Sequence, residues 1–406
     1  MYIGAIADDF TGATDVATAL RERGLRTTVV IGDHDIPSDA DAVVVALKSR
    51  TAPVDEAVAA SVRAADRLTE AGADRLYVKY CSTFDSTDEG NIGPVLDAVL
   101  DRVAADRTVV VPSFPGNGRT VRDGRLFVGG TLLEDSSMRH HPLTPMTKSR
   151  LRDILAPQTR TALTEIDLPT VRSGPVALRS AIDAAPAGYL IMDAVTDEDL
   201  AAIAAATAHL RVLSGGAALA AALDAPAGTS PGALPDVGAG RLVVCGSASA
   251  ATRAQIRDAI DRGAAARQVD VDAALADPRA EAAALADWVR RLPDDALPLV
   301  YSVGVLTDVR VGSADASAAV EHVLSALVAD LVGAGDVHRV IVAGGETSGA
   351  VVQALGVTAL HIGPQLAPGV CWSVGTAASG VSVALVLKSG NFGAVDLFSA
   401  AWKELA

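Results

Sequence analysis

Short apolar segments rich in Val, Ile and Leu alternate with longer Ala-rich segments along nearly the whole chain, and this alternation most constrains the fold. In residues 1 to about 225 we predict strands near residues 2–7, 26–31, 42–47, 75–79, 108–112 and 189–193. Between them we predict helices near residues 12–23, 54–71, 92–105, 147–155, 175–185 and 198–210. Strands that alternate with helices indicate an α/β domain with a mostly parallel sheet and helices on both faces.

A stretch rich in Ala, Gly and Pro at residues 224–240 follows this pattern, as expected of a domain linker. A second pattern predicts strands near residues 241–246, 267–270, 297–303, 338–343 and 357–362. Two longer β-branched runs, residues 370–374 and 382–388, predict an antiparallel pair that closes the sheet. We therefore expect two α/β domains, residues 1–225 and 241–406, joined by a linker at 226–240.

The composition argues against several classes of protein. A formal net charge of −15 disfavours nucleic-acid binding, because a binder needs a basic face to displace counterions from phosphates. Apolar runs such as residues 242–245 and 340–343 are far shorter than the roughly 18–20 residues of a membrane span, so we expect no membrane contact. Three distant cysteines argue against a disulfide framework or a zinc site. We expect a cytoplasmic protein, and the acidic, Ala-rich composition is compatible with a homodimer.

The first predicted strand runs directly into two adjacent carboxylates, Asp8 and Asp9, followed by a Thr-Gly turn and a helix. In open α/β sheets, ligands bind where strands end and helices begin. Adjacent acids repel each other and do not help folding, so they favour a role toward a hydroxyl-rich ligand, a metal ion or a proton transfer. The alternative is that Asp9 or Thr11 only caps the helix.

Other charged and polar side chains also follow predicted strands, most of them in the first half of the chain. Only five of the 34 basic residues are lysines, and Lys48, Lys79 and Lys388 each follow an apolar run. A compact ammonium at a strand end suits a carboxylate or a phosphate, although a lysine at a sheet edge can also simply reach into solvent. Together with the two aspartates, the polar residues after these strands would suit a polyol acid: Lys48, Arg50, Lys79, Ser82, Asp85, Asn117 and Arg119.

Three glycine- and hydroxyl-rich turns follow strands of the second half, at residues 246–249, 344–349 and 388–393. Free amides at a helix start, together with the helix dipole, favour an anion, and glycine lets the backbone approach it closely. Neither the P-loop lysine nor the glycine spacing of a dinucleotide fingerprint is present. Three such turns in one domain suit a nucleotide, although each alone could be an ordinary cap or turn.

These motifs resemble those of the four-carbon acid sugar kinase family. The similar segments are Ala-Asp-Asp-Phe-Thr-Gly-Ala at residues 7–13, and residues 79–94, 114–120, 141–147, 344–349 and 388–393. Residues 79–95, which include Lys-Tyr-Cys-Ser-Thr-Phe-Asp-Ser-Thr, most resemble the branch that acts on 3-oxo-tetronate. Two residues depart from the pattern: Arg122 stands where an aromatic residue is expected, and Lys148 where an acid is more usual.

The resemblance implies a sugar-acid-binding N-terminal domain, a nucleotide-binding C-terminal domain and an active-site cleft between them. It implies ATP- and Mg²⁺-dependent phosphorylation of the terminal hydroxyl of a four-carbon acid, with Asp8 or Asp9 orienting that hydroxyl and accepting its proton. Alternatives are a D-threonate or D-erythronate kinase, or a non-catalytic sensor of nucleotide or sugar acid. The metal ligands stay open, and the expected nucleotide contacts are Ser247, Ser249, Gly344, Gly345, Glu346, Thr347, Ser348, Lys388 and Gly390.

Overall fold

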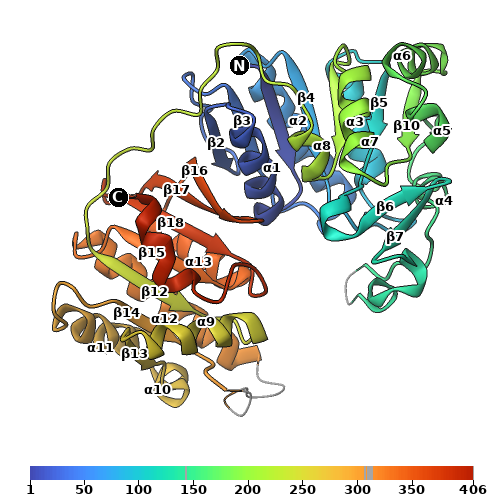
Figure 1. The fold of residues 1–406 in the computed structure, drawn as a ribbon. Coiled ribbons are helices and arrows are strands. Elements are labelled where there is room, and N and C mark those ends of the chain that lie inside the picture. The colour runs from blue at the N-terminus through green and yellow to red at the C-terminus, as the bar shows by residue number, and fades with distance from the viewer. Residues whose placement is uncertain (142–143, 306–307, 309–313, 406) are drawn as a thin grey trace. The chain divides into compact units, whose positions relative to one another are not determined.

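The computed structural model describes residues 1–141, 144–305, 308 and 314–405 (Figure 1). Two residues of the motif at 141–147 lie outside this part of the chain. The structure divides into two compact units, Met1–Gly232 and Ala233–Ala406. The stretch predicted as a linker, residues 226–240, spans the boundary between these units, and its role as a linker stays a prediction.

The main sheet of the first unit is parallel and has the strand order β11-β4-β1-β3-β2. Both faces of its strands are buried, which explains their continuous apolar sequences. β2 and β3 lie on one side of β1, and β4 and β11 lie on the other, so the direction of the chain switches at β1. The strands are β1 (Ile3–Ala7), β2 (Thr27–Ile31), β3 (Ala42–Ala46), β4 (Arg75–Lys79) and β11 (Val212–Gly215).

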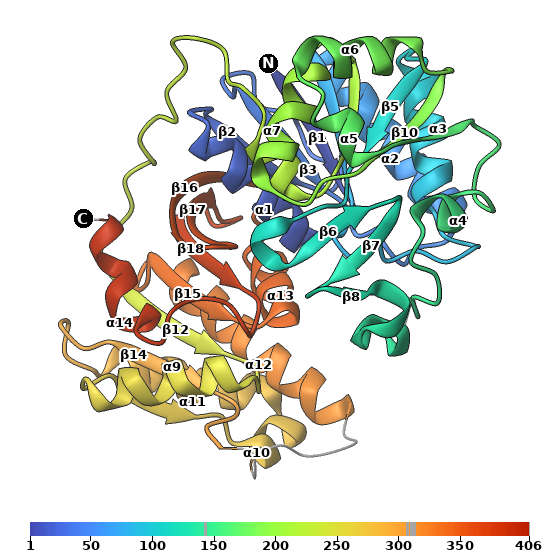
Figure 2. The ribbon, with the colours of Figure 1, turned by 45° about the vertical axis from the view of Figure 1, so that its right-hand side comes forward.

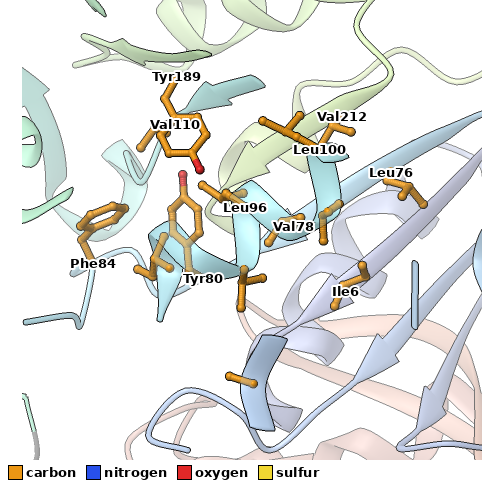
Figure 3. Packing of buried hydrophobic residues seen from close by; sticks show 14 of the residues in the cluster. Ile6, Leu76, Val78, Tyr80, Phe84, Leu96, Leu100, Val110, Tyr189 and Val212 are labelled. Carbon is orange, nitrogen blue, oxygen red and sulfur yellow. The ribbon is translucent and has the colours of Figure 1, made fainter. Parts of the chain in front are cut away.

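Helices cover both faces of this sheet. α2 contacts α3 and shares a core with Ile6, Leu76 and Val78, whereas α1 contacts α8 and β3 (Figure 3). The helices of this unit are α1 (Phe10–Glu22), α2 (Val54–Glu70), α3 (Ile92–Arg102), α4 (Leu151–Leu155), α5 (Leu168–Val171), α6 (Pro175–Ala184), α7 (Asp197–Ala206) and α8 (Ala217–Ala221). The 3-10 helices are η1 (Pro115–Asn117), η2 (Leu133–Asp135) and η3 (Ser137–His140).

The first half contains more than the single sheet predicted from its sequence. A parallel sheet has the order β5-β10-β9, and Figure 3 shows Val110 and Tyr189 from it in the same core as the main sheet. An antiparallel sheet has the order β6-β7-β8. These strands are β5 (Arg107–Val110), β6 (Arg119–Arg122), β7 (Arg125–Val128), β8 (Thr131–Leu132), β9 (Leu163–Ile166) and β10 (Gly188–Met192).

The helix predicted near residues 147–155 is shorter than expected, since α4 begins at Leu151. The preceding residues run alongside β7 instead: the amide of Leu126 donates to the carbonyl of Ser149, and Arg125 forms a bridge with Arg150. Pairing with the neighbouring hairpin thus overrides the local helical pattern.

The second unit contains one sheet with the order β16-β17-β18-β15-β12-β14-β13. β18, β15, β12, β14 and β13 are parallel, and the predicted antiparallel pair of β17 and β18 is confirmed (Figure 2). The strands are β12 (Arg241–Cys245), β13 (Ala265–Gln268), β14 (Pro298–Tyr301), β15 (Arg339–Ala343), β16 (Ala359–Ala367), β17 (Val370–Thr376) and β18 (Ser382–Lys388).

Helices α9 and α14 pack against a core that includes Val243, Ile341 and Val386, and α12 contacts α10, α11 and α13. The helical segments are α9 (Ala250–Asp261), α10 (Val271–Ala276), α11 (Pro278–Arg290), α12 (Ala314–Gly333), α13 (Gly345–Leu355), α14 (Leu397–Ala400) and η5 (Ala401–Leu405).

Helix α12, with 20 residues, is longer than any helix expected from the sequence, and it is largely apolar. Among the described residues, Asp315–Gly333 alone has the length and composition of a helix that could cross a membrane. Leu324, Leu327, Val328 and Leu331 on this helix are completely buried within the unit. Its apolar character is therefore explained by packing against neighbouring helices, as in the core helix of a folded domain.

Candidate active site

The polar residues predicted at the strand ends of the first unit are placed by the parallel register. Ala7 at the end of β1 is level with Ala46 of β3 on one side and with Lys79 of β4 on the other. Lys79 is in turn level with Gly215 of β11. The segments that follow these strands therefore leave the sheet at one edge, next to the switch at β1, where open α/β sheets bind ligands.

Asp8, Asp9 and Arg50 form one ion-pair cluster at this edge. Arg50 binds Asp8 with two hydrogen bonds, both 2.8 Å, and its Nη2 also donates to Asp9 Oδ1 at 2.7 Å. Burial disfavours the guanidinium cation, but the hydrogen bonds and charge of Asp8 and the charge of Asp9 raise the pKa of Arg50. The repulsion expected between adjacent acids is thus balanced by a bidentate arginine.

Asp9 is also the N-cap of α1. Its Oδ1 accepts a hydrogen bond of 2.9 Å from the amide of Gly12, so the capping interpretation of this residue is confirmed. Burial raises the pKa of Asp9, Arg50 opposes the change, and Asp8 adds to it. A carboxylate that caps a helix while its pKa is raised can hold the helix and still accept a proton.

Lys79 is a buried lysine without a hydrogen bond or ion pair among the described residues. Its side chain is only 5% exposed. The ammonium lies against the first turn of α1, since a Cβ atom added at Gly12 would be 2.7 Å from Nζ. An unpaired buried charge is costly for folding, so this position is compatible with the predicted contact to a ligand, which stays a prediction.

Asp15 belongs to this cluster but was not among the residues predicted from the sequence. Its Oδ1 is buried and has no hydrogen-bond partner among the described residues. Burial raises the pKa of Asp15 to about 6, Lys79 and Arg50 oppose the change, and Asp9 adds to it. Asp15 lies three residues after Gly12 in α1, and this spacing, which puts both on one helix face, was the available signal.

Three polar side chains in the segment after β4 are linked to one another by hydrogen bonds. Thr83 Oγ1 lies 2.9 Å from Cys81 Sγ and donates to Asp85 Oδ1 at 2.6 Å. Burial raises the pKa of Cys81, Asp85 adds to this effect, and Arg50 and Lys79 oppose it. Phe84 adopts a positive φ of 53°, a conformation costly for a bulky residue, while its buried ring packs edge-on against Tyr80. Asp85 is thereby held in a fixed turn.

Arg119 lies in the segment that follows β5. It donates to the carbonyl of Asn117, while its Nε is buried and has no partner among the described residues. The Asn117 side chain itself is exposed. Arg119 therefore keeps hydrogen-bonding capacity for an anion, which Arg50, engaged by two carboxylates, largely lacks.

Lys48 and Ser82 were also predicted as site residues, but within the described part of the chain neither is joined to this cluster by a hydrogen bond. Lys48 is exposed, and Ser82 is half-buried; neither side chain has a hydrogen bond to the aspartates or to Arg50. Asn91 is a supporting residue that the site prediction omitted. Its Nδ2 donates to the carbonyls of Ser49 and Ala52 at 2.8 and 3.3 Å, which holds the loop that carries Arg50.

The three glycine turns of the second unit come together at the carboxyl ends of β12, β15 and β18. The amides of Gly246 and Ser247 donate to the carbonyl of Ala343, and the amide of Gly344 donates to the carbonyl of Lys388. A Cβ at Gly390 would lie 2.2 Å from Ser247 Oγ, so a larger residue there would force the Ser247 side chain to move. Ser249 caps α9 and also donates to the carbonyl of Gly390 at 2.6 Å.

The segment after β15 that was predicted as a turn is itself the first turn of a helix, because α13 begins at Gly345. Gly344 has a φ of +135°, which only glycine adopts without strain. Thr347 and Ser348 are buried and Ser348 Oγ lacks a partner among the described residues, whereas Gly345 and Glu346 are exposed. The amides at the start of α13 thus form an anion-binding arrangement.

Lys388 is buried, with 1% of its side chain exposed. Its Nζ donates to Thr252 Oγ1 and to the carbonyl of Gly390, both at 3.1 Å. Burial lowers the pKa of Lys388 to about 8, and Cys245 slightly opposes this change. The ammonium therefore supports the turn that carries Gly390, and its predicted contact with nucleotide stays a prediction.

Replacing Lys388 by Met is expected to remove a pH dependence of stability. The folded-state pKa is below the unfolded value of 10.5, so the unfolded chain binds more protons and the wild type gains stability as pH rises. Between pH 7 and pH 10, the wild type should gain about 2 to 3 kcal/mol relative to Lys388→Met in urea unfolding. The exposed Lys403→Met is the control; equal pH slopes for wild type and Lys388→Met would contradict the expectation.

Comparison with known proteins agrees with this two-part architecture. Residues 3–223 match the family described as a sugar-binding N-terminal domain, and residues 242–398 match the family described as a nucleotide-binding C-terminal domain. The chain belongs to the four-carbon acid sugar kinase family.

Relatives named 3-oxo-tetronate kinase are similar over their full lengths. The protein from Cupriavidus necator is 42% identical, with 99% of this chain and 97% of the relative covered. The one from Salmonella typhimurium is 40% identical, with 100% and 99% covered. A crystal structure from Salmonella typhimurium LT2 has a TM-score of 0.91, 40% identity and 99% coverage of both chains. One from Haemophilus influenzae has a TM-score of 0.87, 38% identity, and coverage of 99% and 100%.

Proposed function

We propose that this protein is an ATP-dependent kinase that phosphorylates the terminal 4-hydroxyl of a four-carbon sugar acid, with 3-oxo-tetronate as its substrate in carbohydrate-acid catabolism. The observation that carries the proposal is a polar site at the carboxyl edge of each unit. One contains the half-buried carboxylates Asp8 and Asp9 bound to Arg50, with the buried Lys79 beside them, and the other contains glycine turns at helix starts. The names of the full-length relatives support the choice of 3-oxo-tetronate.

In the first unit the cations and carboxylates have different roles in this proposal. Arg119, with its unpartnered Nε, binds the carboxylate of the acid. Both oxygens of Asp8 accept hydrogen bonds from Arg50, so the role of Asp8 is to hold the Arg50 guanidinium in place. Asp9 accepts the proton of the attacking hydroxyl, because its raised pKa favours that transfer. The hydroxyl oxygen forms a bond to the γ-phosphorus of ATP while the bond to the ADP oxygen breaks.

In the second unit the amides of Gly345–Ser348, the hydroxyls of Ser247 and Ser249, and Gly390 contact ATP in this proposal. Mg²⁺ would neutralise charge on the β- and γ-phosphate oxygens. Among the described residues no group of three or more His, Cys, Asp or Glu could hold a metal ion. The exposed carboxylate of Glu346 fits this cofactor nonetheless, because Mg²⁺ is usually held by one or two carboxylates with phosphates and waters. The cleft between domains, a cytoplasmic location and a homodimer stay predictions.

Release of ADP from ATP in the presence of single acids tests the proposal. The panel contains 3-oxo-tetronate, D-threonate and D-erythronate, and calorimetric binding of each acid is measured alongside. We expect the highest kcat/KM with 3-oxo-tetronate, since a carbonyl and a secondary hydroxyl differ by one hydrogen-bond donor. Highest turnover with another acid would refute the substrate, and binding without any ADP release would refute the kinase.

Replacing Asp9 by Asn is expected to lower kcat by about 10²- to 10⁴-fold, because the amide cannot accept the proton of the hydroxyl. The Gly12 amide can still donate to the Asn side-chain oxygen, so α1 should remain capped. Asp8→Asn should mainly raise KM for the acid, since it disturbs Arg50. Steady-state kinetics with the acid varied at saturating ATP measure kcat and KM for both variants, and nearly full turnover of Asp9→Asn at saturating acid would exclude its role as the proton acceptor.

A further inference from the structure

Two buried groups of opposite charge in the first unit face the same region without contacting each other. Asp15 Oδ1 is buried and has no hydrogen-bond partner among the described residues. Lys79 is 5% exposed, and none of the hydrogen bonds of the described residues involves its Nζ. The two groups also form no ion pair, so more than 4.0 Å separates the ammonium nitrogen from the carboxylate oxygens. Each nevertheless feels the charge of the other, because Lys79 opposes the rise in the pKa of Asp15.

Gly12 is the reason that these two groups can lie near the same helix turn. A Cβ there would be 2.3 Å from Asp9 Oδ1 and 2.7 Å from Lys79 Nζ, so only glycine lets the lysine approach the helix. Asp15 follows on the same face of α1. The charged groups around the pair are Asp9, which repels Asp15, and Arg50, which attracts it.

The chemistry of the pair selects its ligand. A carboxylate or phosphate next to Lys79 would be repelled by Asp15 and Asp9, and a cation next to Asp15 would be repelled by Lys79 and Arg50. A hydroxyl is neutral, accepts from an ammonium and donates to a carboxylate at the same time. It would satisfy both buried groups, each of which costs free energy while it is unpaired.

We propose that Lys79 and Asp15 together bind one hydroxyl group of the sugar acid, with Lys79 donating to its oxygen and Asp15 accepting its hydrogen. This assignment rests on the proposed function for the class of ligand, and it changes the role of Lys79 from carboxylate binding to hydroxyl recognition. Because both partners are charged and buried, an acid that lacks this hydroxyl leaves them unpaired and is rejected. The pair therefore determines which hydroxylated acids bind.

Calorimetric binding without ATP tests the pair. The ligands are 3-oxo-tetronate, D-erythronate, and the forms of D-erythronate that lack the hydroxyl at carbon 2 or 4, the two hydroxyls that 3-oxo-tetronate also carries. The variants are Asp15→Asn and Lys79→Met, with the exposed Asp55→Asn as a control for net charge. One deoxy acid should bind the wild type roughly 10- to 100-fold more weakly than D-erythronate, as expected for hydrogen bonds to charged groups. Both variants should lose this discrimination against that same deoxy acid, whereas Asp55→Asn should retain it.

Variants that bind D-erythronate more weakly but keep the full discrimination would overturn the proposal, because only a structural role predicts that result. Thermal unfolding checks each variant, and Lys79→Gln and Asp15→Ser replace any variant that does not fold. KM for ATP should be unchanged in both variants. If the wild type binds the acids with this discrimination but releases no ADP, the kinase assignment fails and the hydroxyl pair stands. If it releases ADP but does not discriminate among the deoxy acids, the pair fails and the kinase stands.

Discussion

Replacing Arg50 by Met should cause a large combined loss of activity and stability. The substitution leaves Asp8 and Asp9 adjacent, largely buried and without their shared cation. We expect kcat/KM for the acid to fall by about 10²- to 10³-fold, as for other electrostatic groups at active sites. The free energy of unfolding should fall by about 2 to 3 kcal/mol at pH 7, somewhat less than for fully buried pairs.

The pH dependence distinguishes this cause from simple loss of packing. Without Arg50 the two carboxylates repel each other, so their folded-state pKa values rise and the folded protein binds protons more tightly than the unfolded chain. The stability deficit should therefore shrink as pH falls from 7 toward 5 in urea unfolding. Arg63→Met removes an exposed ion pair with Asp33 and should change little. A deficit independent of pH would contradict the electrostatic explanation.

Gly344→Ala should be the most damaging single change in the nucleotide site. At a φ of +135° an alanine is strained, and its Cβ would lie 2.9 Å from Thr347 Oγ1 and 3.3 Å from the amide nitrogen of Ser247. Relief of this strain requires the turn to move away from the start of α13. We expect a loss of about 1 to 3 kcal/mol in stability and about 10²-fold in ATP affinity, which corresponds to nearly 3 kcal/mol.

Calorimetric titration with ATP and urea unfolding measure the two effects. Gly333→Ala is a suitable control, because a Cβ at that position meets no atom within 4 Å and no positive φ is required. The control should bind ATP as the wild type does. If Gly344→Ala also keeps wild-type ATP affinity, the start of α13 is not the phosphate-binding element.

Sequence patterns predicted the strands whose ends carry the candidate site, because parallel strands buried on both faces have continuous apolar sequences. They also located Asp8, Asp9 and Arg50, since each follows such a strand. They missed the hairpin of β6 and β7, although Asp123-Gly124, whose φ angles are both positive, is the two-residue turn that signals such a hairpin. The pairing of β7 with Ser149 and Arg150 is long-range and leaves little local signal, which is why a helix was expected there.

Sequence patterns also could not predict which charged side chains of the site are buried, or how burial shifts their pKa values. Asp15 has the position of an ordinary polar residue in the second turn of a helix, and only its burial next to Lys79 distinguishes it. The contacts of the Lys388 ammonium with Thr252 and the carbonyl of Gly390 were likewise not predicted, and its contact with nucleotide stays a prediction. Burial depends on the neighbours of a side chain in space, and these follow from the complete fold.

The fit of Lys79 against Gly12 links the candidate site to the cooperativity of folding. Asp9 caps α1 and binds Arg50, while the first turn of the same helix covers the lysine ammonium. Local opening of that turn would separate the acid from the arginine and expose the lysine to water in a single event. The charged site therefore forms only when the first turn of α1 forms. The backbone amide hydrogens of that turn should exchange with solvent at the rate at which Asp9 and Arg50 separate.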